Sequence, residues 1–441
     1  MIPMKIAILT PAFPPVTGGV SQSMGNFYQT YLKVKNHPPY LVFTTAEGVD
    51  KGKEFSRNVV RVDRNSYRMT FRVVKYFLGF VRDALKVVLV KERHRGRKYI
   101  LNQLAWFGNV KNYLRALSGC YYADRLLQGR ISPDIVMVAY IRYMGIVGYL
   151  LSKYLKVPLV IICHGDDIII HNLEHIVALD RAAGFITRSK AIEDVVRERY
   201  SMKGKHYKKV WDGVIEKFYH IAEDKATLRE HLNIPPNEFA ILDIGRLCPR
   251  KNFDSPIIAL AMLARKGIFT DERPAHLYII GVGEELEYLE NLVRKLKLEG
   301  SVTFLGGLDD VNRNKFLKAS DLFVMTPYDM PDSIEGFGIV YIESNFFGVP
   351  VIGTISGGVV ESVEDGVSGF LLPQRDPKAL AQKIQLFYED EDLLQRMGMQ
   401  GQERVQTKYA WEPILERYLS LFDEILKDHR AGKKFNRGGN P

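Results

Sequence analysis

The stretch FAILDIGRLCPRKNF, residues 239–253, combines a buried strand with a charged loop. Its first seven residues are almost all apolar and do not alternate with polar ones, which is typical of a strand covered on both faces. The loop that follows carries Arg246 and Lys251 and leads into a helix-like segment. A buried strand followed by a loop and a helix is the repeating unit of a parallel α/β sheet.

The same unit recurs along the chain. Short apolar runs separated by helix-like segments are KIAILT (5–10), YLVFTT (40–45), DIVMVA (134–139), PLVIIC (158–163), GFIT (184–187), LYIIG (277–281), VTFLG (302–306), LFVMT (322–326) and PVIGT (350–354). Together with residues 239–245 they form two series, which predict an α/β protein with two Rossmann-like, doubly wound parallel-sheet domains facing a cleft. Ligands in such folds bind beyond the carboxyl ends of the strands, so we expect the site in the loops that follow them.

A polar segment separates the two series. DGVIEKFYHIAEDKATLREHLNIPPNEF begins at Asp212, is rich in charge and contains two consecutive prolines. We therefore expect a first domain over residues 1–213 and a second over residues 214–409. The polar, glycine-rich end of the chain, residues 429–441, is expected to be disordered.

The net charge of +10 is concentrated in one part of the first domain. Residues 51–130 contain 19 Lys and Arg against 5 Asp and Glu, a net charge of +14. A helix-like run within them, residues 68–93, spaces its basic residues along one stripe: Arg68, Arg72, Lys75, Arg82, Lys86 and Arg93. Its apolar face is expected to consist of Val74, Phe77, Leu78, Val81, Leu85, Val88 and Leu89.

Two interpretations of this basic helix stay open. A helix with these two faces is typical of an interfacial helix attracted to an anionic membrane surface, which we favour. The alternative is an ordinary amphipathic helix packed on its own domain, and nucleic-acid binding has little support. The three cysteines have no paired spacing, and no apolar run of about 20 residues occurs. The apolar run near the N-terminus is short, so we expect no signal peptide. We expect a cytoplasmic protein, peripheral on the inner face of the membrane.

Polar residues follow several of the predicted strands. Gly18 and Gly19 precede a serine-rich helix start that could hold a phosphate, although many such loops only connect. Arg246 and Lys251 could grip a diphosphate or be solvated surface cations, and their place at the end of a buried strand favours the ligand. His164 directly follows PLVIIC and could orient a sugar hydroxyl or simply be satisfied by its own loop.

Motifs for a metal or a bound cofactor are weak or absent. HNLEH, residues 171–175, matches the inverted zinc-protease pattern, but a match of five residues arises easily by chance. The phosphate-binding pattern G-x-x-x-x-G-K-[ST] does not occur. We expect neither a metal ion nor a cofactor.

An ordered series of segments resembles one family over nearly the whole chain. The segments are GGV, PDIVMVA, PLVIICHGDD, VWDGVIEKFY, GRLCPRKN, IIGVGEE, VTFLGGL, ASDLFVMTP, EGFGIVYIES, GVPVIGTISGGVVESVEDGVSGFLL and YAWEPILERY. They are similar to the retaining, nucleotide-sugar-dependent glycosyltransferases of family 4 (group 1), which share the GT-B fold. The resemblance implies that a final helix, residues 410–428, crosses back onto the first domain.

The resemblance also implies a role for each matching residue. Arg246 and Lys251 would grip the donor diphosphate, Glu335 would contact the donor sugar, and Glu343 would hold the ribose hydroxyls. His164 would face the sugar across the cleft; with Glu335, Arg246 and Lys251 it would form the catalytic set. The remaining positions would supply backbone and loop contacts to the donor: Gly18, Gly19, Gly306, Leu308, Gly336, Phe337, Gly338 and Ile339. One departure from the family is Asn252, where glycine is commoner.

The reaction implied is transfer of a hexose from GDP-mannose or a UDP-hexose to a glycan or lipid-linked acceptor. In this class the leaving phosphate is thought to take the acceptor's proton, so no nucleophile is assigned and no metal is required. Fixed cations near the leaving group lower such a barrier by electrostatic preorganisation. Rival hypotheses are a phosphorylase or epimerase on the same fold, and a catalytically silent sugar-nucleotide binder at the membrane surface.

Overall fold

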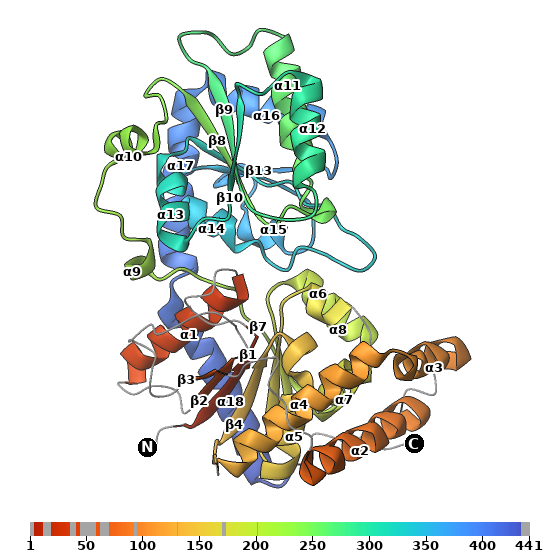
Figure 1. The fold of residues 1–441 in the computed structure, drawn as a ribbon. Helices are drawn as coiled ribbons and strands as arrows, with labels where there is room; N and C mark the ends of the chain where they lie inside the picture. Colours follow the sequence, from red (N-terminus) through yellow and green to blue (C-terminus); the bar gives the residue numbers. More distant parts are fainter. Residues whose placement is uncertain are drawn as a thin grey trace. The chain divides into compact units, whose positions relative to one another are not determined.

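The structure is a computed structural model that describes residues 4–11, 19–35, 41–44, 59–61, 70–91, 95–129, 131–169, 173–200 and 202–433. The chain divides into two compact units; Figure 1 draws both, coloured by position in the sequence. The N-terminal unit is Met1–Trp211 together with Glu412–Pro441, and the C-terminal unit is Asp212–Trp411. Each unit is described by itself.

A seven-stranded parallel sheet forms the centre of the N-terminal unit, in the order β3-β2-β1-β4-β5-β6-β7. Its strands are β1 (Ile6–Thr10), β2 (Leu41–Thr44), β3 (Val59–Arg61), β4 (Ile135–Ala139), β5 (Leu159–Cys163), β6 (Gly184–Thr187) and β7 (His206–Lys209). The central strands β1, β4, β5 and β6 are buried at every residue, as expected from their apolar sequences.

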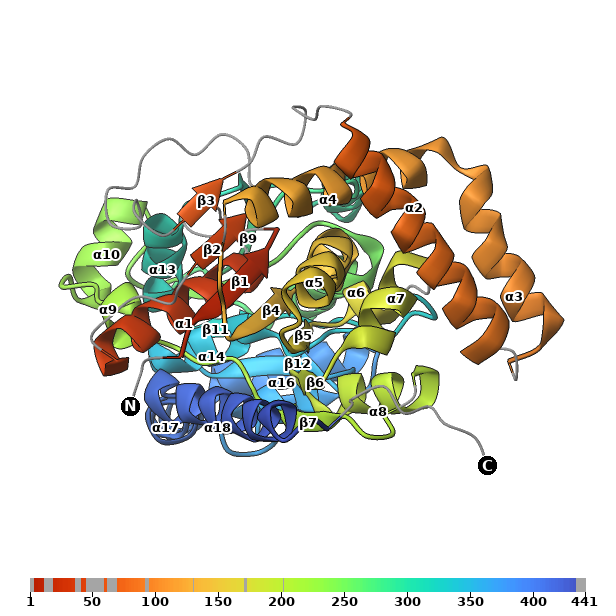
Figure 2. The same cartoon turned by 90° about the horizontal axis from the view of Figure 1, so that it is seen from below.

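Helices cover both faces of this sheet (Figure 2). The helices described in this unit are α1 (Gly19–Lys35), α2 (Phe71–Lys86), the π-helix η2 (Val87–Lys91), α3 (Gly96–Leu104), the 3₁₀-helix η4 (Ala105–Gly108), α4 (Val110–Gln128), α5 (Ile141–Leu155), α6 (Asp166–Ile169), α7 (Leu173–Arg181), α8 (Lys190–Arg199) and α18 (Trp411–Arg430). Helix α5 packs so closely on the sheet that a Cβ at Gly148 would lie 2.4 Å from Val138. Helices α1 and α18 meet at Phe27 and Tyr418, whose ring centroids are 5.1 Å apart.

The C-terminal helix α18 belongs to the N-terminal unit. The ring of His206 on β7 lies 3.2 Å from Asp428, and Arg417 donates to the carbonyl of Lys209 at 3.0 Å. The helix continues to Arg430, so the expected disorder is wrong for residues 429–430. Residues 434–441 lie outside the described part of the chain.

A six-stranded parallel sheet, in the order β10-β9-β8-β11-β12-β13, forms the centre of the C-terminal unit. Its strands are β8 (Phe239–Ile244), β9 (Ala275–Ile280), β10 (Val302–Gly306), β11 (Leu322–Val324), β12 (Val351–Thr354) and β13 (Gly369–Leu372). Its helices are α9 (Glu216–Tyr219), α10 (Lys225–Leu232), the 3₁₀-helix η5 (Pro249–Lys251), α11 (Asp254–Arg265), α12 (Leu286–Leu296), α13 (Asp310–Ala319), α14 (Ile339–Phe346), α15 (Val359–Ser362), α16 (Pro377–Glu389) and α17 (Glu391–Lys408).

Two apolar layers sandwich this second sheet. One layer packs Ile257 of α11, Leu289 of α12 and Ile384 of α16 against the strands. The other contains Leu228 of α10 and Tyr341 of α14. Both units are therefore doubly wound, and the prediction of two parallel-sheet α/β domains is confirmed.

The basic helix is present, but its faces differ from the expectation. Helix α2 and η2 cover residues 71–91, and Arg68 and Arg93 lie outside the described residues. The buried side chains are Val73, Phe80, Ala84, Val87 and Val88, so of the predicted apolar face only Val88 is buried. Val74, Leu78 and Leu89 are exposed, and Phe77, Val81 and Leu85 are half-buried. In the described part of the chain, no helix combines the length and the apolar character that a membrane span needs.

Candidate functional site

The carboxyl edge of the second sheet brings together a carboxylate and two cations. Arg250 donates to Oε2 of Glu335 at 2.6 Å, and Lys251 donates to the same oxygen at 2.8 Å. The three side chains are only 12–13% exposed. Burial alone would raise the pKa of Glu335, but the charges of Lys251 and Arg250 and their hydrogen bonds outweigh burial and lower it to about 2. The carboxylate is therefore ionised at any physiological pH.

Backbone contacts fix the loop that carries Glu335. The N–H of Gly358 donates to the carbonyl of Glu335 at 2.8 Å. Gly357 has a φ of +45°, and a Cβ there would lie 2.2 Å from that carbonyl oxygen, so only glycine allows this approach. On the other side, the N–H of Tyr328 donates to the carbonyl of Arg250 at 3.0 Å. The ion pair thus lies between loops that are anchored at several points.

Asn252 stands at a position where the sequence resemblance leads us to expect glycine, and its backbone conformation suits both residues. Its φ is +61°, a left-handed conformation that glycine adopts freely and asparagine adopts more readily than most residues. Its side chain donates to the carbonyl of Thr326 at 2.9 Å and to the hydroxyl of Ser255 at 2.9 Å. The asparagine therefore ties the loop after β8 to the loop after β11.

The loop that begins at Glu335 leads into the N-terminus of α14. Gly338 precedes the helix with a φ of +76°, and a Cβ there would lie 2.7 Å from the ring of Tyr341. Phe337 is buried, and Ile339 is the first residue of the helix. The first N–H groups of a helix lack intrahelical partners and carry partial positive charge, which suits an anion. The structure thus brings Gly336, Phe337, Gly338 and Ile339 to the same edge as Lys251.

Glu343 lies two turns further along α14 and is fully buried. Its Oε1 accepts a hydrogen bond from the hydroxyl of Tyr219 at 2.7 Å and lies 3.3 Å from Arg313. Among the described residues its Oε2 has no hydrogen-bond partner. That oxygen is the one that could meet a ligand hydroxyl, and the ribose role of Glu343 stays a prediction.

The other donor-site residues of the C-terminal unit follow neighbouring strands. Arg246, in the loop directly after β8, is exposed. Gly306 ends β10 with a φ of +67°, and Leu308 lies two residues later. These positions and the Glu335 loop share the carboxyl edge of one parallel sheet, as the strand-end argument predicts.

His164 lies at the carboxyl end of β5 in the N-terminal unit. Burial, with the nearby positive charge of Arg188, holds the pKa of His164 well below its usual value, so the ring is neutral. Its Nε2 is buried, with no hydrogen-bond partner among the described residues. Its place opposite the donor sugar stays a prediction, because it belongs to the other unit. Gly18 lies outside the described residues, and Gly19 is the first residue of α1.

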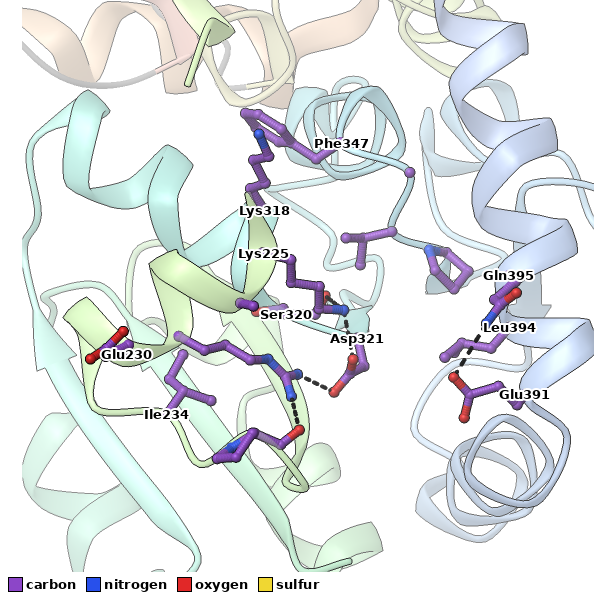
Figure 3. Close-up of a pocket in the computed structure, with 16 residues that line it drawn as sticks. Lys225, Glu230, Ile234, Lys318, Ser320, Asp321, Phe347, Glu391, Leu394 and Gln395 are labelled. Atoms are coloured by element: carbon purple, nitrogen blue, oxygen red, sulfur yellow. Dashed lines mark hydrogen bonds and ion pairs between the residues drawn. The ribbon is translucent and has the colours of Figure 1, made fainter. Parts of the chain in front are cut away.

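A separate cavity of about 830 Å³ lies in the C-terminal unit (Figure 3). Three of the residues that line it come just before strands: Ser320 and Asp321 precede β11, and Pro350 precedes β12. The cavity therefore lies at the amino edge of the sheet, opposite the edge that carries the Glu335 loop. Lys225 and Arg229 both pair with Asp321, at 2.7 and 2.5 Å. Its position and its paired charges distinguish it from the edge where the predicted residues gather.

Sequence reasoning missed three side chains of this site. Arg250 directly precedes Lys251, and this adjacency to a predicted donor-binding residue is the one sign in the sequence that Arg250 belongs to the site. Tyr219 and Arg313, which hold Glu343, come from segments distant in the sequence and carry no recognisable motif.

A family model matches most of the C-terminal unit. Residues 224–404 match the model described as glycosyl transferases group 1. This match contains every C-terminal residue named above except Tyr219.

Two curated proteins illustrate the relatives. The chain is 27% identical over 313 residues to N-acetyl-alpha-D-glucosaminyl L-malate synthase of Bacillus anthracis. The matched segment covers 69% of this chain and 78% of that protein. The chain is 31% identical over 203 residues to the GDP-mannose-dependent monoacylated alpha-(1-6)-phosphatidylinositol monomannoside mannosyltransferase of Corynebacterium glutamicum, which covers 45% of this chain and 51% of the relative.

Among solved structures, the fold is similar to that of Anabaena HepE in complex with UDP and glucose. The TM-score is 0.69 and the sequence identity 21%, over 96% of this chain and 100% of the other. At this identity the likeness concerns the fold, and it extends over both units.

Proposed function

We propose that this chain is a GT-B glycosyltransferase of group 1, and that it acts as a retaining hexosyltransferase with its donor site at the carboxyl edge of the second sheet. The donor would be GDP-mannose or a UDP-hexose, and the acceptor a glycan or a lipid-linked sugar. The observation that carries the proposal is the pairing of Glu335 with Lys251 in the loop that leads into α14.

The charges at this edge suit the departure of a nucleoside diphosphate. Lys251 and Arg246 follow β8, and the N-terminus of α14 adds backbone N–H groups. Cations and helix-terminal donors that are already in place stabilise negative charge on the leaving phosphate without reorganising. With such groups present, the proposed reaction needs no divalent metal ion.

The ionised Glu335 is suited to stabilise the donor sugar rather than to donate a proton. Positive charge develops on the anomeric carbon as the donor bond breaks, and a carboxylate nearby would stabilise it. With a pKa of about 2, Glu335 holds no proton to donate at neutral pH. We therefore assign it as a ligand and electrostatic partner of the donor sugar, and the leaving phosphate accepts the proton of the acceptor hydroxyl.

The choice of donor base rests on experiment. The name of the Corynebacterium relative specifies GDP-mannose, whereas HepE was solved with UDP and glucose. A thermal-shift panel of UDP, GDP and ADP with their sugars discriminates them, because a bound ligand raises stability by mass action. The proposal expects one base to raise the melting temperature and the others to leave it unchanged; no response to any of them would contradict it.

The second partner that we propose is an anionic membrane surface. Phe71 and Leu78 on α2 are 85% and 60% exposed, and Leu89 in η2 is exposed as well. Lys75 and Lys86, also exposed, lie beside this apolar stripe. Exposed apolar side chains next to cations are what an interfacial helix presents to anionic lipid. A peripheral position on the inner membrane face would bring a lipid-linked acceptor within reach.

A further inference from the structure

Arg250 has no assigned role, yet it makes a shorter contact with Glu335 than Lys251 does. Its guanidinium donates to Oε2 at 2.6 Å, on the oxygen that also accepts from Lys251. The side chain is 13% exposed, and the carbonyl of the same residue accepts from the N–H of Tyr328. Arg250 is therefore held in place from both its backbone and its side chain.

The balance of charge gives this contact a consequence. A carboxylate and an ammonium group 2.8 Å apart largely cancel each other's field, so a Lys251–Glu335 pair alone would offer little to a diphosphate. Arg250 adds a second positive charge, and the three groups together carry a net charge of +1. Asp243 is a second buried acid near Lys251; burial outweighs the charge of Lys251 and raises the pKa of Asp243 well above its usual value, which favours its neutral form.

We propose that Arg250 is a positioning residue which neutralises Glu335 and so leaves the charge of Lys251 available to the donor diphosphate. In this arrangement Glu335 stays ionised and faces the sugar while Lys251 serves the leaving group. The inference rests on the proposed function and deepens it, since it explains how Lys251 keeps an effective positive charge for a nucleoside diphosphate, beside Arg246 and the N-terminus of α14, although Lys251 is paired with Glu335.

Charge removal tests this role directly. In Arg250→Gln the net charge of the three groups falls from +1 to zero, so the affinity for the matching nucleoside diphosphate, UDP or GDP, is expected to fall about 10- to 100-fold. Changing Glu335→Gln in the same protein removes the neutralising carboxylate and restores a net charge of +1. We therefore expect the double variant Arg250→Gln/Glu335→Gln to regain most of the lost affinity, although not turnover.

The measurement is isothermal titration calorimetry with UDP and with GDP on the wild-type protein and these variants. Arg265→Gln, which changes an exposed arginine on α11, is the matched control and is expected to bind like the wild type. Weakened binding in the single variant with recovery in the double variant supports the inference. No loss in Arg250→Gln overturns it, and so does a loss without recovery, because a direct phosphate contact or a merely structural role would not be rescued by removing Glu335.

This experiment also separates the inference from the proposed function. If the wild-type protein binds neither nucleotide, the proposed donor site fails and the inference fails with it. If the wild type binds and Arg250→Gln binds equally well, the donor site stands and only the role of Arg250 is overturned. Arg250→Lys keeps the positive charge and changes only the shape of the donor group. We therefore expect this variant to bind the nucleotide within about threefold of the wild type.

Discussion

The ammonium group of Lys251 lies 2.8 Å from Oε2 of Glu335, although the two residues are 84 positions apart in the sequence. The contact joins the loop after β8 to the loop that enters α14. It places a cation suited to a leaving phosphate beside a carboxylate suited to a sugar, and most of the predictions below follow from this pair.

Removing the Glu335 carboxylate is expected to abolish most turnover without weakening nucleotide binding, because both cations stay in place. Glu335→Gln keeps the shape of the side chain but loses the charge that the proposed mechanism places beside the sugar in the transition state. Loss of one such electrostatic contact typically lowers kcat by about 10²–10³-fold. Steady-state kinetics with the donor identified by thermal shift, together with calorimetry for the free nucleotide, separate the two effects. A kcat within twofold of the wild type would reject the role of Glu335.

The same carboxylate makes stability depend on pH in acid. The folded-state pKa of Glu335 is about 2, below its ordinary value of 4.5. A depressed pKa contributes stability above the unfolded value, and this stability is lost as the pH falls from about 4.5 towards 2. A shift of this size corresponds to roughly 3 kcal/mol. Urea unfolding of wild type and Glu335→Gln should therefore give a difference in unfolding free energy that shrinks between pH 5 and pH 3; a constant difference would contradict the lowered pKa.

The buried Glu343 should depend on Tyr219. Tyr219→Phe removes the hydroxyl that donates to Oε1 at 2.7 Å, inside a fully buried environment. Oε1 then keeps the longer contact with Arg313 but loses its shorter hydrogen bond, which costs about 1–3 kcal/mol, so the variant should unfold at a lower urea concentration. Tyr288→Phe, in which the ring is 52% exposed, is the control and should leave the midpoint unchanged. Equal midpoints for all three proteins would show that this hydrogen bond does not matter.

The apolar stripe on α2 should control membrane binding. Phe71→Ser/Leu78→Ser is expected to lower the fraction of protein that sediments with vesicles containing anionic lipid. Lys75→Gln/Lys86→Gln should weaken binding by about 1 kcal/mol for each charge and reduce its sensitivity to salt. Val311→Ser, which changes an exposed apolar residue of the other unit, is the control. Equal sedimentation with neutral vesicles at every salt concentration would reject the electrostatic part of the proposal.

Turnover should not require a divalent ion. In the proposed mechanism Arg246, Lys251 and the N-terminus of α14 would supply the positive charge that a metal ion supplies in other transferases. Dialysis against EDTA should therefore leave kcat unchanged, and added Mg²⁺ or Mn²⁺ should not raise it. Loss of activity on chelation, restored by either ion, would contradict the proposal.

Much of the fold could be predicted because buried parallel strands are unmistakable in sequence. Runs such as ILDI in β8 and LVII in β5 are apolar enough that no other element explains them. The strands that were missed lie at sheet edges or are very short: β3 (Val59–Arg61), β7 (His206–Lys209) and β13 (Gly369–Leu372). The sequence of β7, HYKK, is polar because an edge strand is covered less, and β7 is held by contacts with its neighbour β6 and with helices α8 and α18.

Helix α2 shows the opposite difficulty. Its periodicity was strong enough to predict the helix, but several apolar stripes were available on a helix this rich in apolar residues. Packing selected Val73, Phe80 and Ala84 rather than Val74 and Leu78. Which face is buried depends on the partners of the helix, and these come from elsewhere in the chain.

The functional site divides in the same way. The positions after β8 and before α14 could be predicted, because loops at strand ends carry function in this architecture. The ion pair of Arg250 with Glu335 could not, since a surface lysine or arginine and a paired one look alike in sequence.

The measurement that tests the central claim most directly is release of nucleoside diphosphate from radiolabelled GDP-mannose, UDP-glucose and UDP-N-acetylglucosamine, with label followed into glycan and glycolipid acceptors. We expect the wild-type protein to transfer label from one of these donors and Glu335→Ala to transfer almost none. Turnover by Glu335→Ala equal to that of the wild type with every donor would contradict the assignment of the site.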